Sequence, residues 1–291
     1  MKEFIEYNYD VKCENLSFFG ETLYFKYFDK YYLLSKLKRD VAEYKVLLNF
    51  LINNNVYFFK ILINKFGEIY SEYNRNKYVL MECESENEII ELPVKGNALV
   101  DAENNWGSIW ESRIAQLLKQ KVEYKLNKDL YYILDYYIGI TEICVNNYNF
   151  IRSKYPEKLM STIQHNRIKY PLYSFDYYNS TNYLFDYFFR DLAEYLKAMF
   201  FYADLTDEEL INKINLNEFD DFSANMLIIR VLYPTYFYEV YDLFDKSNIN
   251  TGSIFDFIKK SSQFENFILK LIYYLSQRFN IIVRVPFKYQ H

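Results

Sequence analysis

The sequence of 291 residues contains few of the residues that form tight turns, with 6 glycines and 5 prolines. A sheet-rich fold of this length would need many more of them, because glycine and proline supply the backbone angles that tight turns require. Their scarcity therefore favours helices. The composition, 51% hydrophobic and 25% charged, is globular, so disorder throughout the chain is excluded. The length permits one large domain or two lobes.

Cysteine and histidine are also scarce, which excludes several kinds of site. Cys13, Cys83 and Cys144 are odd in number and far apart, so neither a disulfide framework nor a C-x-x-C metal site is available. Such cysteines are typical of a reducing compartment, and we expect a cytoplasmic protein. His165 and His291 are the only histidines. A histidine-rich metal centre is therefore excluded, and a Ser-His-Asp arrangement would have to use one of these two residues.

Excess positive charge and long apolar runs are missing as well. The formal net charge is −5, with acidic and basic residues interspersed, so we expect no nucleic-acid partner. The N-terminus lacks the apolar core of a signal peptide, and charges interrupt every apolar run well short of about 18 residues. We therefore expect no membrane span and no secretion. The residues in excess are tyrosine and phenylalanine, 33 and 26 in number, which an AT-rich genome explains more simply than an aromatic binding platform.

The first part of the chain predicts a small strand-rich lobe with one helix. Alternating and aromatic stretches on either side of Gly20 indicate an antiparallel meander within the first 35 residues. Apolar residues then recur at helical spacing over 41–51, and the asparagines at 53–55 end that helix. Segments 56–63 and 69–82 predict further strands, separated by turn-forming residues.

The rest of the chain predicts a helical lobe. The stretch 82–105 is acidic and contains turn-forming residues, so we place the boundary there, with an N-terminal lobe at 1–95 and a C-terminal lobe at 96–291. Thr206 and Glu209 have the spacing of a capping box. Helical stripes are predicted at 106–118, 130–148, 185–202, 210–214, 222–232, 236–244, 254–258 and 264–279. The predicted fold class is therefore α+β, in two lobes.

This architecture is the one that normally carries phosphoryl transfer. That chemistry needs metal-binding carboxylates, a base for the nucleophile, and a lysine with backbone amides over the nucleotide phosphates. Lys36 ends a predicted strand and Glu43 lies on the next helix, where a phosphate-binding lysine and its carboxylate partner could meet. The loop around Gly20 is not G-x-G-x-x-G, and the chain has no P-loop. A nucleotide could still bind beneath a glycine-poor loop.

Five segments of the chain then stand out together. They are Trp106–Ile114, Tyr136–Glu142, His165–Ile168, Phe185-Asp186 running into Arg190–Tyr195, and Ile229–Pro234. In this order they resemble the endospore coat-associated kinase-like proteins of Gram-positive bacteria, a family similar in fold to aminoglycoside and choline phosphotransferases. The resemblance covers about residues 106–243 and reaches the first lobe by architecture alone. It implies a two-lobed, protein-kinase-like fold of the aminoglycoside phosphotransferase type.

The resemblance also implies a degenerate catalytic loop. Active phosphotransferases of this fold carry His-Gly-Asp, whose Asp is the catalytic base, followed by a metal-binding Asp. This chain has His165-Asn166-Arg167 instead, and a guanidinium stays protonated and cannot accept the substrate proton. His165 and Arg167 therefore occupy the positions of the catalytic residues, and the resemblance implies that the chain is a pseudokinase. The metal-type aspartate is either Asp186 or Asp176, and the sequence does not choose between them.

The function that the resemblance implies is that of a catalytically impaired binding or assembly protein of the spore coat, with other coat proteins as partners. One alternative is an active ATP-dependent small-molecule phosphotransferase, in which Asp176 or Asp186 holds Mg²⁺ and some other carboxylate replaces the base. A second alternative is an unrelated helical interaction protein, which a helical first lobe would favour.

Two buried polar groups are expected to act as scaffolding in the second lobe. Arg230 is expected to pair with Asp191 or Glu194, because a buried ion pair fixes geometry more reliably than it adds net stability. Thr141 and Glu142, in the middle of a tyrosine-rich helix, are expected to form another buried polar anchor.

Overall fold

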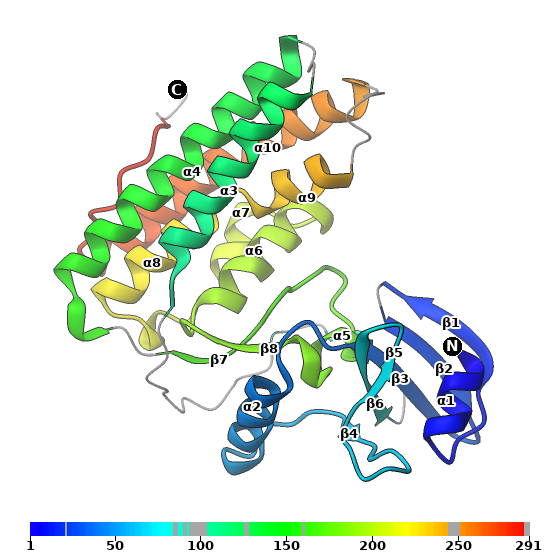
Figure 1. The fold of residues 1–291 in the computed structure, drawn as a ribbon. Helices are drawn as coiled ribbons and strands as arrows, with labels where there is room; N and C mark the ends of the chain where they lie inside the picture. Colours follow the sequence, from blue (N-terminus) through cyan, green and yellow to red (C-terminus); the bar gives the residue numbers. More distant parts are fainter. Residues whose placement is uncertain are drawn as a thin grey trace. The chain divides into compact units, whose positions relative to one another are not determined.

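A computed structural model describes residues 1–20, 22–83, 87–89, 92, 104–124, 128–158, 161–243 and 251–287. By residue contacts the chain divides into two compact units (Figure 1). The first consists of Met1–Ala98 with Ile163–Leu184, and the second of Leu99–Thr162 with Phe185–His291. Most of the predicted boundary stretch lies outside the described residues, and the division at 95 and 96 stays a prediction.

The first unit is built on a six-stranded antiparallel sheet. Its strands are β1 (Glu14–Phe19), β2 (Thr22–Tyr27), β3 (Lys30–Lys36), β4 (Lys60–Ile61), β5 (Ser71–Tyr73) and β6 (Asn76–Cys83). Their order is β1-β2-β3-β6-β4, and β5 also pairs with β6. The predicted meander is therefore confirmed. The predicted strand at 56–63 was wrong for most of its length, because only Lys60 and Ile61 pair with β6.

Helices α1 and α2 accompany this sheet. Helix α2 (Val41–Asn53) confirms the predicted helix, and it begins at Asp40, whose side chain accepts a hydrogen bond from the Ala42 amide. Helix α1 (Lys2–Asn8) was not predicted. Seven residues are too few to form a stable helix alone, so packing against the sheet, rather than a visible periodicity, must stabilise it.

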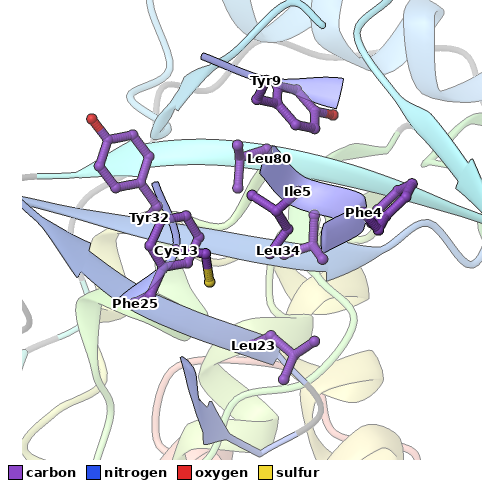
Figure 2. Packing of buried hydrophobic residues seen from close by; sticks show 9 residues of the cluster. All are labelled: Phe4, Ile5, Tyr9, Cys13, Leu23, Phe25, Tyr32, Leu34 and Leu80. Atoms are coloured by element: carbon purple, nitrogen blue, oxygen red, sulfur yellow. The ribbon is translucent and has the colours of Figure 1, made fainter. Parts of the chain in front are cut away.

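The two faces of the sheet pack against different partners. Successive side chains of a strand point to opposite faces, so Leu34 and Leu80 lie on one face with Phe4 and Ile5 of α1 (Figure 2). The pairs next to them in β3 and β6 lie on the other face. There the Ser180 hydroxyl approaches the Met81 sulfur at 3.3 Å. This second face therefore carries the segment 163–184, far along the chain.

That segment consists of short elements. They are β7 (Thr162–His165), α5 (Ser174–Tyr177), the 3₁₀ turn η2 (Ser180–Asn182) and β8 (Tyr183–Asp186), and β7 pairs with β8. The Asn166 amide donates to the Asn182 carbonyl oxygen at 2.7 Å, and Asn179 Nδ2 donates to Ser35 Oγ at 2.7 Å. These bonds fix the loop after β7 beside the end of β3.

The second unit is helical. Its helices are α3 (Trp106–Glu123), α4 (Lys128–Lys154), η1 (Pro156–Lys158), α6 (Arg190–Tyr202), α7 (Asp207–Ile211), η3 (Leu216–Glu218), α8 (Asp221–Leu232), α9 (Thr235–Leu243) and α10 (Thr251–Ser276). Helix α8 is buried from Phe222 onward and packs against α4, α6 and α10. No helix in the described part of the chain is long and apolar enough to cross a membrane.

Most helix predictions for this unit are confirmed, including the capping box of Thr206 and Glu209. Two were wrong. The helix predicted at 185–202 begins only at Arg190, because Phe185 and Asp186 belong to β8. The separate helices predicted at 254–258 and 264–279 are one helix, α10, because the residues between them contain neither glycine nor proline to end it.

Candidate functional site

A cavity of about 590 Å³ lies within the first unit. It is lined by Gly20, Thr22, Ser35, Lys36, Lys38, Arg39, Glu43, Asn166, Arg167, Lys169, Asp176, Thr181, Asn182 and Leu184. Four predicted site residues are among them: Lys36, Glu43, Arg167 and Asp176. The structure thus brings the predicted lysine and glutamate together with the loop that follows β7. The other two predicted residues, His165 and Asp186, do not line this cavity.

Lys36 and Glu43 reach the cavity from neighbouring elements. Lys36 is the last residue of β3, and Glu43 lies in the first turn of α2, where a carboxylate complements the helix dipole. Within the described residues, the Lys36 ammonium has no ion pair with Glu43 or with any other carboxylate. The two residues share the cavity, but they do not form the ion pair that an active phosphotransferase site would use.

Arg39 ties the connection between β3 and α2 to the segment around β8. Its Nη2 donates to the backbone carbonyl oxygens of Thr181, at 3.4 Å, and Tyr183. Burial lowers the pKa of Arg39 from its ordinary value, while Tyr44 and Glu43 oppose that shift. The guanidinium stays protonated at neutral pH. Its acceptors are uncharged, so these hydrogen bonds position the positive charge without cancelling it.

His165 is buried at the end of β7, with 1% of its surface exposed. Its Nε2 lies 2.8 Å from the Tyr177 carbonyl oxygen. Its ring lies against the rings of Tyr177 and Tyr183, with centroids 4.1 and 4.5 Å away. This position indicates that His165 holds the loop after β7 in place, because a ring enclosed in this way has no access to a reacting group in the cavity.

The loop after β7 contributes the positive charge that faces Asp176. Arg167 is exposed, and Lys169 lies near the β1–β2 turn, since a Cβ atom on Gly20 would be 3.6 Å from Lys169 Nζ. Burial raises the pKa of the Asp176 carboxyl, and the positive charge of Lys169 opposes the shift. Ionisation of Asp176 therefore costs free energy in the folded state, and the charge of Lys169 offsets that cost only in part.

We expect Asp176→Asn to stabilise the folded chain at pH 7. A carboxyl whose pKa is raised by folding binds protons more readily in the folded state, so its ionisation destabilises the fold increasingly as pH rises from the unfolded pKa through the folded one. The amide removes that cost. Thermal unfolding should give a higher Tm for the variant at pH 7 and a smaller difference near pH 4. An equal difference at both pH values would contradict this account.

Asp186 lies at the end of β8 in the second unit, and its carboxylate is fully engaged. Oδ2 accepts from Trp106 Nε1 at 3.1 Å and forms an ion pair with Arg190, while Oδ1 accepts from the Tyr187 amide at 2.8 Å. Only 3% of the residue is exposed. The Arg190 guanidinium already neutralises the carboxylate. Asp186 therefore does not fit the role of a metal ligand.

Asp176, the other metal-type candidate, fits Mg²⁺ no better. It lines a cavity in which cationic side chains outnumber carboxylates, and Glu43 is the only other carboxylate there. Magnesium is usually bound through one or two carboxylates together with substrate phosphates, and the five cationic side chains of this cavity would repel it. No group of three or more histidine, cysteine or acidic side chains in the described ranges is arranged to hold a metal.

The second unit also contains the predicted buried ion pair. Arg230 Nε donates to Glu194 Oε1 at 2.7 Å, which confirms Glu194, of the two candidates, as its partner. Lys197 Nζ donates to the same oxygen at 2.8 Å. Thr141 is buried as predicted, but Glu142 is exposed, so that part of the prediction was wrong: Glu142 lies on the outer side of α4.

The family described as "Spore coat putative kinase YutH" matches residues 2–270. The chain belongs to this family. The match extends well beyond the segments at 106–243 and includes the strand-rich first part, so the alternative of an unrelated helical interaction protein is wrong. The sheet of the first unit contradicts that alternative as well. Among curated proteins, no match was found.

Solved structures show which fold this spore coat kinase-like protein adopts. An aminoglycoside phosphotransferase from Alicyclobacillus acidocaldarius is similar with a TM-score of 0.58 and 10% identity, covering 95% of this chain and 97% of that one. A spectinomycin phosphotransferase in complex with ADP and spectinomycin is similar with a TM-score of 0.51 and 9% identity, covering 93% and 97%. The fold is therefore the α+β, aminoglycoside phosphotransferase-like fold that the sequence predicted.

Several lining residues of the cavity were not predicted. Lys38 and Arg39 follow Lys36 in a basic run that is visible in the sequence, and Lys169 follows Arg167 in the same way. In the sequence, only the local clustering of positive charge could have indicated these residues. Their convergence was not predictable without the packing of the loop after β7 beside β3.

Proposed function

We propose that this spore coat kinase-like protein is a binding or assembly protein that does not transfer phosphoryl groups. The observation that carries the proposal is the engagement of Asp186 by Arg190 and Trp106. Phosphoryl transfer depends on metal ions that bridge the phosphates and neutralise the developing charge. A carboxylate whose oxygens already accept three hydrogen bonds, one from a guanidinium, offers no position to such an ion.

Arg167 supports the same proposal, because the reaction needs a proton acceptor as well as a metal site. It occupies the position of the catalytic base, and a side chain that remains protonated cannot accept the proton of an acceptor hydroxyl. The family description points to the spore coat, so we infer that the chain associates with the forming coat and with other coat proteins. Its cavity would then serve binding rather than turnover.

Phosphate release from Mg-ATP tests the catalytic half of the proposal. We expect the purified chain to release no more phosphate than its Asp176→Asn variant, because neither the base nor the metal site is available. The Lys119→Ala variant, which alters an exposed lysine on α3, controls for handling. Turnover well above that of Asp176→Asn would sink the proposal and favour an active small-molecule phosphotransferase in which Asp176 holds the metal.

Fractionation of coat material tests the other half. We expect both the wild-type chain and Asp176→Asn to be recovered with the spore coat in equal amounts, because association requires the folded surface and not turnover. Recovery of the wild-type chain alone would link coat association to the chemistry of the cavity, contrary to the proposal.

A further inference from the structure

The cavity of the first unit is strongly positive, although the whole chain has a net charge of −5. Five of its lining side chains are cationic and two are carboxylates. The cations are Lys36, Lys38, Arg39, Arg167 and Lys169. A concave surface that gathers charge of one sign concentrates the opposite charge in its interior. The cavity is therefore suited to an anion.

Part of this positive charge is not cancelled by carboxylates of the chain. Within the described residues, neither Lys36 nor Lys169 has a carboxylate at ion-pair distance. Arg39 donates to two backbone carbonyl oxygens, which leave its charge in place. The three residues come from the end of β3, the β3–α2 connection and the loop after β7. Three separate elements thus direct positive charge to one site.

The remaining lining groups complement the oxygens of phosphate groups. Thr22 and Ser35 supply hydroxyls, which lie 3.2 Å apart, and Ser35 Oγ also accepts from Asn179 Nδ2 at 2.7 Å. Lysine and arginine form their strongest hydrogen bonds with carboxylate and phosphate oxygens. At about 590 Å³ the cavity has the size of a small-molecule site, larger than a single phosphate needs.

We propose that this cavity binds a small molecule carrying several phosphate groups directly, without a divalent cation. The inference rests on the proposed function, because a site that performs no phosphoryl transfer needs no metal. In an active site the metal ions neutralise the phosphates. Here the fixed cations at Lys36, Arg39 and Lys169 do so, and a bound Mg²⁺ would lie beside like charge. Mg²⁺ therefore competes with the protein for the phosphate oxygens.

Calorimetric titration with tripolyphosphate tests this directly. We expect saturable binding in EDTA, and a several-fold weaker apparent affinity when Mg²⁺ is in excess over the ligand. Lys36→Gln and Lys169→Gln should each lower the affinity about tenfold, because each removes a charge-assisted hydrogen bond. Lys119→Ala removes an exposed lysine far from the cavity residues in sequence and should bind like the wild type. Thermal unfolding without ligand establishes that each variant is folded.

Three results would overturn the inference. They are binding that requires Mg²⁺, absence of binding in EDTA up to millimolar tripolyphosphate, and an equal loss of affinity in Lys119→Ala. Citrate is the comparison ligand. If it bound as tightly as tripolyphosphate, the cavity would recognise negative charge in general and not phosphate groups, which would overturn the assignment of ligand class. The proposed function is tested separately, by phosphate release from Mg-ATP. Binding in EDTA involves no turnover, so the two proposals can fail independently.

Discussion

We expect Glu194→Ala to lower the free energy of unfolding by about 3–5 kcal/mol, because removing one partner of a buried ion pair leaves the other charge without compensation. Glu194 accepts from both Arg230 and Lys197, and Thr235 donates to its second oxygen at 3.1 Å. The side chains of Arg230 and Lys197 are 6% and 3% exposed. Without Glu194, two positive charges would remain buried beside each other.

The pH dependence of stability provides an independent check on this network. Burial by itself would raise the pKa of Glu194, but Lys197 and Arg230 lower it to about 2. A carboxylate with a pKa depressed by folding contributes stability that is fully present above its unfolded pKa. That contribution is lost as pH falls from about 4.5 toward 2. Glu194→Gln should therefore flatten the stability curve in this range.

Chemical denaturation of the wild type, Glu194→Ala and Glu142→Ala measures the effect. Glu142 is an exposed glutamate on α4 of the same unit, so its removal should change stability by no more than about 0.5 kcal/mol. For Glu194→Ala, Tm should fall on the order of 10 °C. A loss comparable to that of Glu142→Ala would show that the network contributes little.

The elements that could be predicted from the sequence are those whose pattern is local. Helix α2 has an apolar stripe, an N-terminal Asp40 that caps it and asparagines that follow its end. The capping box of α7 was predictable for the same reason. Helix α1 was not, because its seven residues show no period and it depends on contacts with the strands of the sheet.

The candidate site divides in the same way. The prediction that Arg167 replaces a catalytic base came from a departure from a motif, and the position of Lys36 at a strand end followed from the period change. The position of Asp186 was not visible, because the helical stripe over 185–202 predicted one continuous helix there. The chain instead leaves β8 and turns into α6, and this turn directs Arg190 back onto Asp186. No local pattern encodes that geometry.

The state of Asp186 leads to the second large expected effect. Asp186→Ala should destabilise the folded chain by about 3 kcal/mol in the absence of any metal, because it leaves the Arg190 guanidinium without its nearest carboxylate. Burial alone would lower the pKa of Arg190, but Asp186 and Glu194 together raise it, so these acids compensate its buried charge. The Trp106 indole would also lose its acceptor.

A double-mutant cycle distinguishes this structural role from a metal-binding one. Asp186→Ala, Arg190→Ala and the double variant are compared by chemical denaturation, with and without Mg²⁺. We expect a coupling free energy of about 1–3 kcal/mol between the two residues, unchanged by Mg²⁺. An Asp186 that served a metal would behave oppositely: its removal would relieve electrostatic strain without metal, and Mg²⁺ would stabilise the wild type alone. That result would return Asp186 to a catalytic site and reopen phosphoryl transfer as the function of this fold.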